Sequence, residues 1–274
     1  MPGNNEARSS RAVVKAPNEI GGTPTQRDRL LHGLSLLHES MEDLFGFPPG
    51  NLSDSLILAY EEGTHGALWA YADGLPGHHI GVPPGTWLNL LSAADRSTMV
   101  SALVHEVGHV AMWWDRDAVV GDTYLQWPGA VEGLATPIGT YACVRHRITP
   151  SWIDYPAGDR DWSSIEDWAT QWINQGLEAL VFGVTGADSL TNGGHSGGSK
   201  IVEAGIFDLL FNHLGGYEPL KRTLQRFVTE FRTPDRARRS PQQKMEDFFI
   251  LLGLESGRDL SDYLEAWGFP TERI

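Results

Sequence analysis

The sequence is poor in cysteine, in basic residues and in long apolar runs, and each shortage excludes a class of protein. A single cysteine, Cys143, leaves no internal disulfide possible. The net charge of −14 argues against nucleic acid or an anionic membrane surface as the main partner. No stretch approaches the roughly 18 apolar residues of a membrane span, and residues 1–25 lack the apolar core of a signal peptide. We therefore expect no membrane insertion, and either an intracellular protein or one whose leader is missing from this sequence.

Polar residues and chain breakers dominate the first 25 residues, which predicts a disordered N-terminal tail over 1–25. Apolar spacing then predicts a helix over 26–44. Short extended segments separated by Gly and Pro follow, and they predict a small sheet of hairpins. These segments are 55–60, 67–72, 78–83 and 86–91.

Beyond residue 91 the apolar spacing becomes helical and stays so to the end of the chain. The expected helices are 95–114, 129–146, 164–180, 199–214, 217–231, 241–253 and 258–267. A sheet layer followed by helices predicts an α+β fold. We expect one domain over 26–274, with the sheet and one helix in 26–114 and a helical subdomain in 115–274.

Within the first of these helices, residues 105–109 read HEVGH. His105 and His109 are about 40° apart around a helix axis and so share one face. Two imidazoles placed in this way can bind one tetrahedral Zn²⁺. Glu106 is rotated by about 100° from His105, where it can take a proton from a water molecule rather than ligate the ion. The alternative is a surface helix with two spare histidines, which the apolar neighbours of the motif disfavour.

A catalytic zinc site needs a third protein ligand. Asp115 is one candidate, but a continuing helix would turn it away from His109. Glu132 is favoured, because the segment between it and His109 leaves room for a chain reversal and a second, antiparallel helix. The alternative role for Glu132 is a first-turn acid that stabilises a helix N-terminus. Thr136, one turn later, is positioned to hydrogen-bond a zinc-bound histidine.

Hydrolysis of a carbonyl compound also requires a donor for the oxyanion that forms during attack. We consider Tyr141, His195 and Tyr217 for this role, of which His195 lies in a glycine-rich loop. A substrate groove is expected along 78–83, if this segment is an edge strand that pairs with an extended peptide. The groove residues would then be His78, His79, Ile80 and Gly81.

HEVGH followed by Glu132 resembles the gluzincin peptidases, and among them the enhancin and mucin-degrading peptidase family. Segments 78–83, 206–227 and 244–270 are similar to further parts of that family. The resemblance implies a zincin-like fold and one zinc ion, with the three ligands and the glutamate base named above. It also implies an endopeptidase, often secreted, that acts on protein or glycoprotein substrates.

Two other functions remain compatible with these residues. One is a non-proteolytic zinc hydrolase that acts on a small molecule, and the other is an inactive metal-binding module. The sequence itself predicts no oligomeric state.

Overall fold

The computed structural model describes residues 4–46, 55–62, 69–71, 78–96, 98–112, 127–154, 158–161, 163–191, 197–230 and 238–272. The fold is α+β, as predicted. The chain forms two compact units. The first comprises Met1–Asp43, Phe47–Arg116 and Ile138–Ile165, and the second Leu44–Gly46, Asp117–Pro137 and Glu166–Ile274. The predicted single domain over 26–274 is therefore divided, because residues 138–165 return to the first unit.

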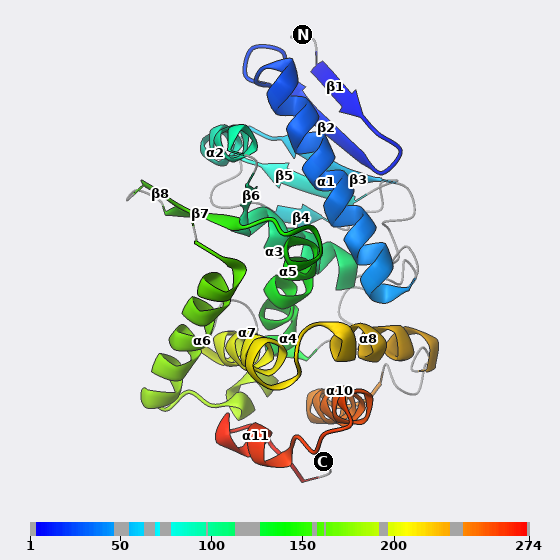
Figure 1. Ribbon diagram of the computed structural model, residues 1–274, viewed down its shortest axis with the longest axis vertical. Helices are drawn as coiled ribbons and strands as arrows, with labels where there is room; N and C mark the ends of the chain where they lie inside the picture. The colour runs from blue at the N-terminus through cyan, green and yellow to red at the C-terminus, as the bar shows by residue number, and fades with distance from the viewer. Residues whose placement is uncertain are drawn as a thin grey trace. The chain divides into compact units, whose positions relative to one another are not determined.

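A five-stranded sheet of order β1-β2-β3-β5-β4 lies in the first unit (Figure 1). Its strands are β1 (Asn4–Arg8), β2 (Ala12–Pro17), β3 (Leu56–Tyr60), β4 (Trp69–Tyr71) and β5 (His78–Val82). The central pairs β2–β3 and β3–β5 are parallel, and the outer pairs are antiparallel. The predicted sheet of hairpins is thus wrong at its centre, where parallel pairing requires crossover connections.

Strands β1 and β2 occupy the stretch 1–25, for which a disordered tail was predicted. Residues 12–14 are apolar and buried, and β2 is hydrogen-bonded between β1 and β3. The hydroxyl of Ser9 accepts hydrogen bonds from the backbone N–H groups of Arg11 and Ala12, which stabilises the turn between the two strands. The tail prediction is wrong here because pairing with β3, a strand distant in sequence, orders a short apolar run that is weak on its own.

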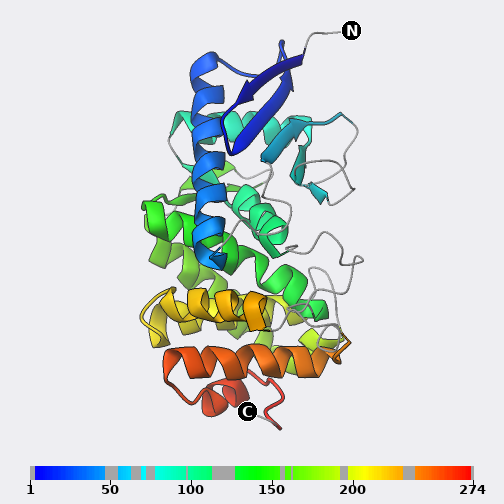
Figure 2. The same cartoon turned by 90° about the vertical axis from the view of Figure 1, so that its right-hand side faces the viewer.

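Helix α1 (Pro24–Phe45) confirms the helix predicted over 26–44. It runs along one side of the five-stranded sheet (Figures 1 and 2). Its apolar stripe is buried, namely Leu30, Leu34, Leu37, Met41 and Leu44.

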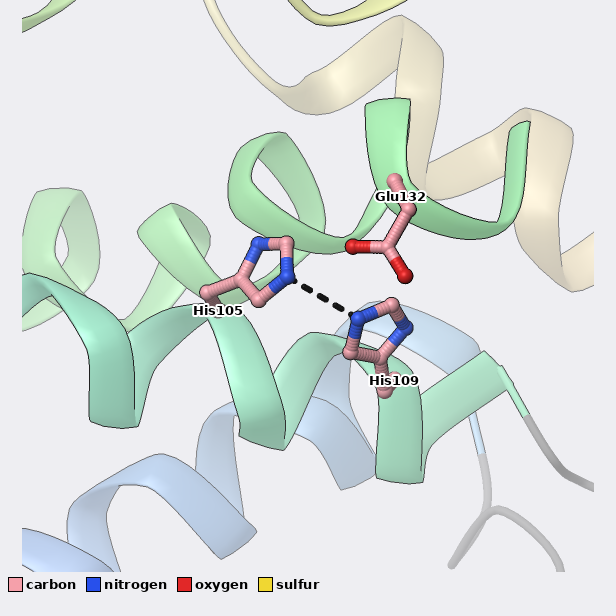
Figure 3. Close-up of side chains that lie close together, drawn as sticks. All are labelled: His105, His109 and Glu132. Atoms are coloured by element: carbon pink, nitrogen blue, oxygen red, sulfur yellow. Dashed lines mark hydrogen bonds between the residues drawn. The ribbon is translucent and has the colours of Figure 1, made fainter. Parts of the chain in front are cut away.

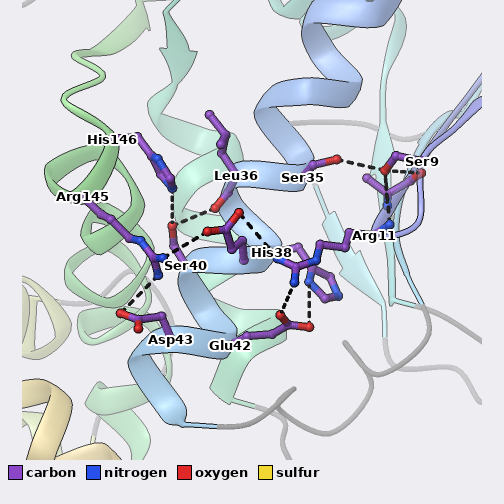
Figure 4. Close-up of polar contacts among 12 residues, drawn as sticks. Ser9, Arg11, Ser35, Leu36, His38, Ser40, Glu42, Asp43, Arg145 and His146 are labelled. Carbon is purple, nitrogen blue, oxygen red and sulfur yellow. Dashed lines mark hydrogen bonds and ion pairs between the residues drawn. The ribbon is translucent and has the colours of Figure 1, made fainter.

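The polar face of α1 carries a network of ion pairs (Figure 4). Arg11, in the turn after β1, lies 3.0 Å from Glu42. Arg145 lies 3.0 Å from Glu39 and 3.2 Å from Asp43. These contacts join the β1–β2 turn and α5 (Ala135–His146) to α1.

Helix α2 (Pro84–Asp95) replaces the strand predicted over 86–91. Its buried residues Trp87, Leu90, Leu91 and Ala94 follow helical spacing, and Pro84 occupies the first turn, where proline is well tolerated. The strand prediction is wrong because residues 86–91 alone do not separate helical from extended spacing, which becomes helical only when Ala94 is included.

A second, three-stranded sheet of order β6-β7-β8 completes the first unit. Its strands are β6 (Met99–Val100), β7 (Pro150–Asp154) and β8 (Gly158–Asp161). Strands β7 and β8 were not predicted from the sequence. Helix α3 (Ser101–Met112) begins directly after β6 and lies within the predicted helix 95–114.

Helices α3 and α5 approach each other very closely. A Cβ atom on Gly139 of α5 would lie 1.9 Å from the carbonyl oxygen of Val104 on α3. Only glycine fits at this crossing, because any side chain would overlap backbone atoms. This contact fixes α3 within the first unit.

The second unit is helical. Its elements are α4 (Pro128–Gly133), α6 (Ile165–Val181), the 3₁₀ helix η2 (Gly186–Leu190), α7 (Gly197–Asp208), the π-helical turn η3 (Leu209–His213), α8 (Glu218–Glu230), α10 (Pro241–Ser256) and α11 (Ser261–Ala266). The helix predicted over 129–146 is divided at Leu134 into α4 and α5. Helices α8 and α10 lie side by side (Figures 1 and 2). Over the described residues, no helix combines the length and apolarity that a bilayer crossing requires.

Candidate metal centre

Helix α3 places His105 and His109 on one face, one turn apart. The apolar residues around them are buried, namely Leu103, Val104, Val107 and Val110. His109 is only 7% exposed, whereas His105 is half-buried. The helix is therefore not the solvent-exposed surface helix considered as the alternative.

The two imidazole rings face each other (Figure 3). Their Nε2 atoms are 2.9 Å apart, and the rings are nearly perpendicular at 87°. Two nitrogens that bind one tetrahedral zinc at ~2.0–2.1 Å lie about 3.3 Å apart. A change of a few tenths of an ångström would thus allow this pair to hold a single ion.

Glu132 joins the histidines in a potential ligand set. One ligand atom from each of His105, His109 and Glu132 lies within 4.8 Å of the others (Figure 3). Among the described residues, this is the one group of three or more His, Cys, Asp or Glu side chains with such spacing. Two imidazoles and one carboxylate are a donor set typical of a catalytic zinc site, which keeps a further position open.

The position of Glu132 on α4 does not match its alternative role as a first-turn acid. Helix α4 begins at Pro128 and has no acidic residue in its first turn, and Glu132 lies at the opposite end, next to Gly133. A carboxylate is electrostatically disfavoured at a helix C-terminus. Glu132 is therefore not a first-turn acid of α4.

Glu106 lies between the two histidines in sequence and is half-buried on α3. It does not belong to the group of three potential ligands. This placement is compatible with a proton acceptor beside the ligands.

The structure adds Glu203, a residue that the sequence analysis did not single out. It lies on α7, is 7% exposed, and accepts a hydrogen bond from the side chain of Thr136. Burial raises the pKa of Glu203 to about 8, the hydrogen bond from Thr136 acts in the opposite direction, and the nearby charge of Glu132 raises the pKa further. One sequence signal was available: a lone glutamate within the apolar run IVEAGIF.

The side chain of Thr136 is buried and forms a hydrogen bond with the carboxyl group of Glu203. Its predicted hydrogen bond to a zinc-bound histidine stays a prediction.

Two tyrosines considered as oxyanion donors have structural hydrogen bonds. The Tyr141 hydroxyl donates to Asp43 on α1, in a very short contact. The Tyr217 hydroxyl donates to the carbonyl of Pro137 at 2.8 Å and is buried. Both hydroxyl groups are thus engaged in hydrogen bonds within the fold, and the oxyanion role of either tyrosine stays a prediction.

The predicted groove segment 78–83 is not an edge strand. Strand β5 lies between β3 and β4, and Ile80 is fully buried in the core. His78 and His79 pair through the backbone with Leu56 and Ile57 of β3. The edge-strand prediction is wrong because β4 covers this side of β5, with Gly81 opposite Trp69. Two other predicted residues, Asp115 and His195, lie outside the described residues.

Comparisons with known proteins bear on the fold alone. No protein-family model and no curated protein matches the chain. A functionally unknown conserved protein from Bacillus anthracis matches with a TM-score of 0.62 at 12% identity, over 98% of this chain and 49% of that one. A metallopeptidase from Bacteroides thetaiotaomicron matches with a TM-score of 0.59 at 12% identity, over 97% of this chain and 41% of that one. The chain thus shares the fold of these structures and spans less than half of their length.

Proposed function

We propose that this protein is a zinc-dependent endopeptidase of the gluzincin type, which hydrolyses peptide bonds in protein or glycoprotein substrates. The observation that carries the proposal is the grouping of His105 and His109, on the HExxH helix α3, with Glu132 on α4: one ligand atom from each residue lies within 4.8 Å of the others. The metallopeptidase-like fold supports it.

In this proposal His105 and His109 bind zinc through their Nε2 atoms, and Glu132 binds through its carboxylate. Bound zinc would supply Lewis-acid chemistry, which lowers the pKa of water and polarises a carbonyl group. His109 is itself buried, and the buried apolar residues Val104, Val107 and Val110 hold α3 in the core.

Glu106 acts as the general base. Its carboxylate takes a proton from water as the water oxygen forms a bond to the scissile carbonyl carbon. The same carboxyl then returns the proton to the amide nitrogen as the C–N bond breaks. Atoms and charges balance, because water is divided between the new carboxyl group and the new amine.

Strand β4 offers an extended substrate a place to pair. It ends the order of the five-stranded sheet, so among the described residues one of its edges has no neighbouring strand. Helix α3 packs against β4. A peptide that adds to this edge as a further strand would run beside the helix that carries His105 and His109.

A Glu106→Gln substitution tests the proposal. We expect the variant to bind zinc as the wild type does, while kcat/KM on a protein substrate falls at least ~100-fold, because the proton acceptor is lost. Glu178→Gln, at an exposed position on α6, is the matched control and should retain activity. Fragments are identified by mass spectrometry.

A panel of substrates separates the proposed function from its two alternatives. It contains an unfolded protein, a mucin-type glycoprotein, a small ester and a small amide. Cleavage of the two proteins supports the proposal. Turnover of the small molecules alone would indicate a non-proteolytic hydrolase. Zinc binding without any turnover would indicate an inactive metal-binding module.

A further inference from the structure

Glu203 is a buried ionisable residue that packing alone does not explain. It lies in the middle of α7, and its neighbours Val202 and Ala204 are fully buried. A carboxyl group in such surroundings destabilises the folded protein unless it forms specific hydrogen bonds. A functional role would explain why a carboxyl group is kept at this buried position.

Glu203 interacts with residues in the segment that contains Glu132. The side chain of Thr136 donates a hydrogen bond to the Glu203 carboxyl. The other carboxyl oxygen, Oε1, is buried and has no hydrogen-bond partner among the described residues. The charge of Glu132 acts on the Glu203 carboxyl group and raises its pKa.

The backbones of α4 and α7 approach closely beside these residues. A Cβ atom on Gly133 would lie 2.6 Å from the carbonyl oxygen of Ser199 and 2.6 Å from Cβ of Val202. No side chain can separate the two helices at this point. The turn that follows Glu132 thus rests directly on the helix that presents Glu203.

We propose that Glu203 is a positioning residue for the metal ligand Glu132. Through Thr136 it holds the turn after α4 against α7, and its carboxyl group restricts the directions in which the Glu132 side chain can point. Outer residues that orient metal ligands contribute substantially to metal affinity. This inference rests on the proposed function, because it requires Glu132 to bind the ion.

Zinc affinity of the full-length protein is the direct test. We expect Glu203→Ala to weaken Zn²⁺ binding about 10- to 100-fold, which is typical for loss of a residue that orients a ligand. Glu203→Gln should rescue binding to within about threefold of the wild type, because an amide oxygen accepts the same hydrogen bond and fills the same space. Thr136→Val should weaken binding in the same direction as Glu203→Ala.

Glu246→Ala provides the matched control. Glu246 is also fully buried, on α10, and accepts a hydrogen bond from Gln242 at 3.0 Å. Its loss should lower the unfolding temperature without changing zinc affinity. A purely structural role for Glu203 predicts the same behaviour for Glu203→Ala.

The absorption spectrum of the Co²⁺-substituted protein gives a second readout. Reorientation of one ligand should change the visible bands of Glu203→Ala and Thr136→Val, and leave those of Glu246→Ala unchanged. If folded Glu203→Ala binds zinc like the wild type and shows its spectrum, the inference is overturned and the proposed function stands. If the wild type binds no zinc, both fall. Should Glu203→Ala not fold, wild-type affinity and spectrum in Thr136→Val would overturn the inference.

Discussion

Two ionisable side chains, the carboxyl of Glu203 and the thiol of Cys143, are nearly or fully inaccessible to solvent. Burial disfavours the charged form of both groups. For Glu203 and Cys143 this effect has consequences that can be measured without knowing a substrate.

The stability of the metal-free protein should depend on pH through Glu203. Its pKa is about 8 in the folded state, against about 4.3 for an unperturbed carboxyl. The folded state therefore keeps a proton that the unfolded state has lost, so this group's contribution is complete below about pH 4.3 and is lost as the pH rises through about 8. We expect Glu203→Gln to gain stability relative to the wild type, by a few kcal/mol, between pH 5 and pH 9.

Urea unfolding at several pH values, in the presence of a chelator, measures this difference. The comparison of wild type with Glu203→Gln cancels the titration of all other groups. A difference that stays constant from pH 5 to pH 9 would show that the pKa of Glu203 is not raised.

Cys143 should be unreactive in the folded protein. It is fully buried on α5, and burial raises the pKa of its thiol to about 12. The thiolate is the reactive form, so modification should require unfolding or local opening. We expect an aromatic disulfide reagent at pH 8 to label the native protein slowly and the urea-unfolded protein completely. Rapid stoichiometric labelling of native protein would contradict the packing of α5.

Parts of the candidate site differ in how far the sequence predicts them. His105, Glu106 and His109 are a local pattern, so their relation follows from helix geometry alone. Glu132 required only that a later segment return to the motif. Glu203 stands out in the sequence only as a lone acid in an apolar run. Its contact with Thr136 could not be predicted, because that contact depends on how α7 packs against the start of α5, which no local spacing encodes.

Among the secondary-structure elements, α3 and α5 have the most demanding contact. The polar network between α1 and α5 adds ion pairs, but Arg145 and Glu39 are partly exposed, and such pairs contribute little, about 0–1 kcal/mol each. The approach of Gly139 to Val104 involves backbone atoms, which cannot move aside separately. Packing, rather than charge, should therefore dominate the stability of this region.

A Gly139→Ala substitution tests whether the packing of α3 against α5 contributes more to stability than the ion pairs between α1 and α5. The added Cβ would meet the Val104 carbonyl oxygen at 1.9 Å, so α3 and α5 must separate, and we expect a loss of about 3 kcal/mol in unfolding free energy. Gly85→Ala, on α2, is the control, because no atom lies within 4 Å of the added Cβ. There we expect a gain of about 0.5–1 kcal/mol, since alanine restricts the unfolded chain. Equal stability of the two variants, measured by urea unfolding, would refute the close packing.

The sequence predicts individual helices and strands better than it predicts which strands pair in the sheet. Helix α1 follows from its long apolar stripe, and α3 from the motif and its apolar neighbours. Strand β2 was predicted as part of a disordered tail and β5 as an edge, because both assignments depend on neighbours distant in the chain. Parallel partners lie far apart in sequence, so their register is a property of the assembled sheet.

For the whole molecule, the acidic charge and the fold similarity point to different properties. A net charge of −14 keeps like-charged molecules apart and favours solubility, but it does not select a fold. Similarity to solved structures at 12% identity shows the fold and no more. Function therefore depends on the grouping of His105, His109 and Glu132, and on whether it binds metal.

Zinc binding by His105, His109 and Glu132 is tested most directly by the metal content of the purified protein. The metal content is measured by mass spectrometry, and protein stripped of metal with a chelator is then titrated with zinc. We predict one zinc ion per chain in the wild type and in Glu106→Gln, with strongly reduced zinc in His109→Ala and in Glu132→Ala. Wild-type protein that takes up no zinc at micromolar concentration, or a His109→Ala variant that retains zinc at full affinity, would contradict the proposed zinc site.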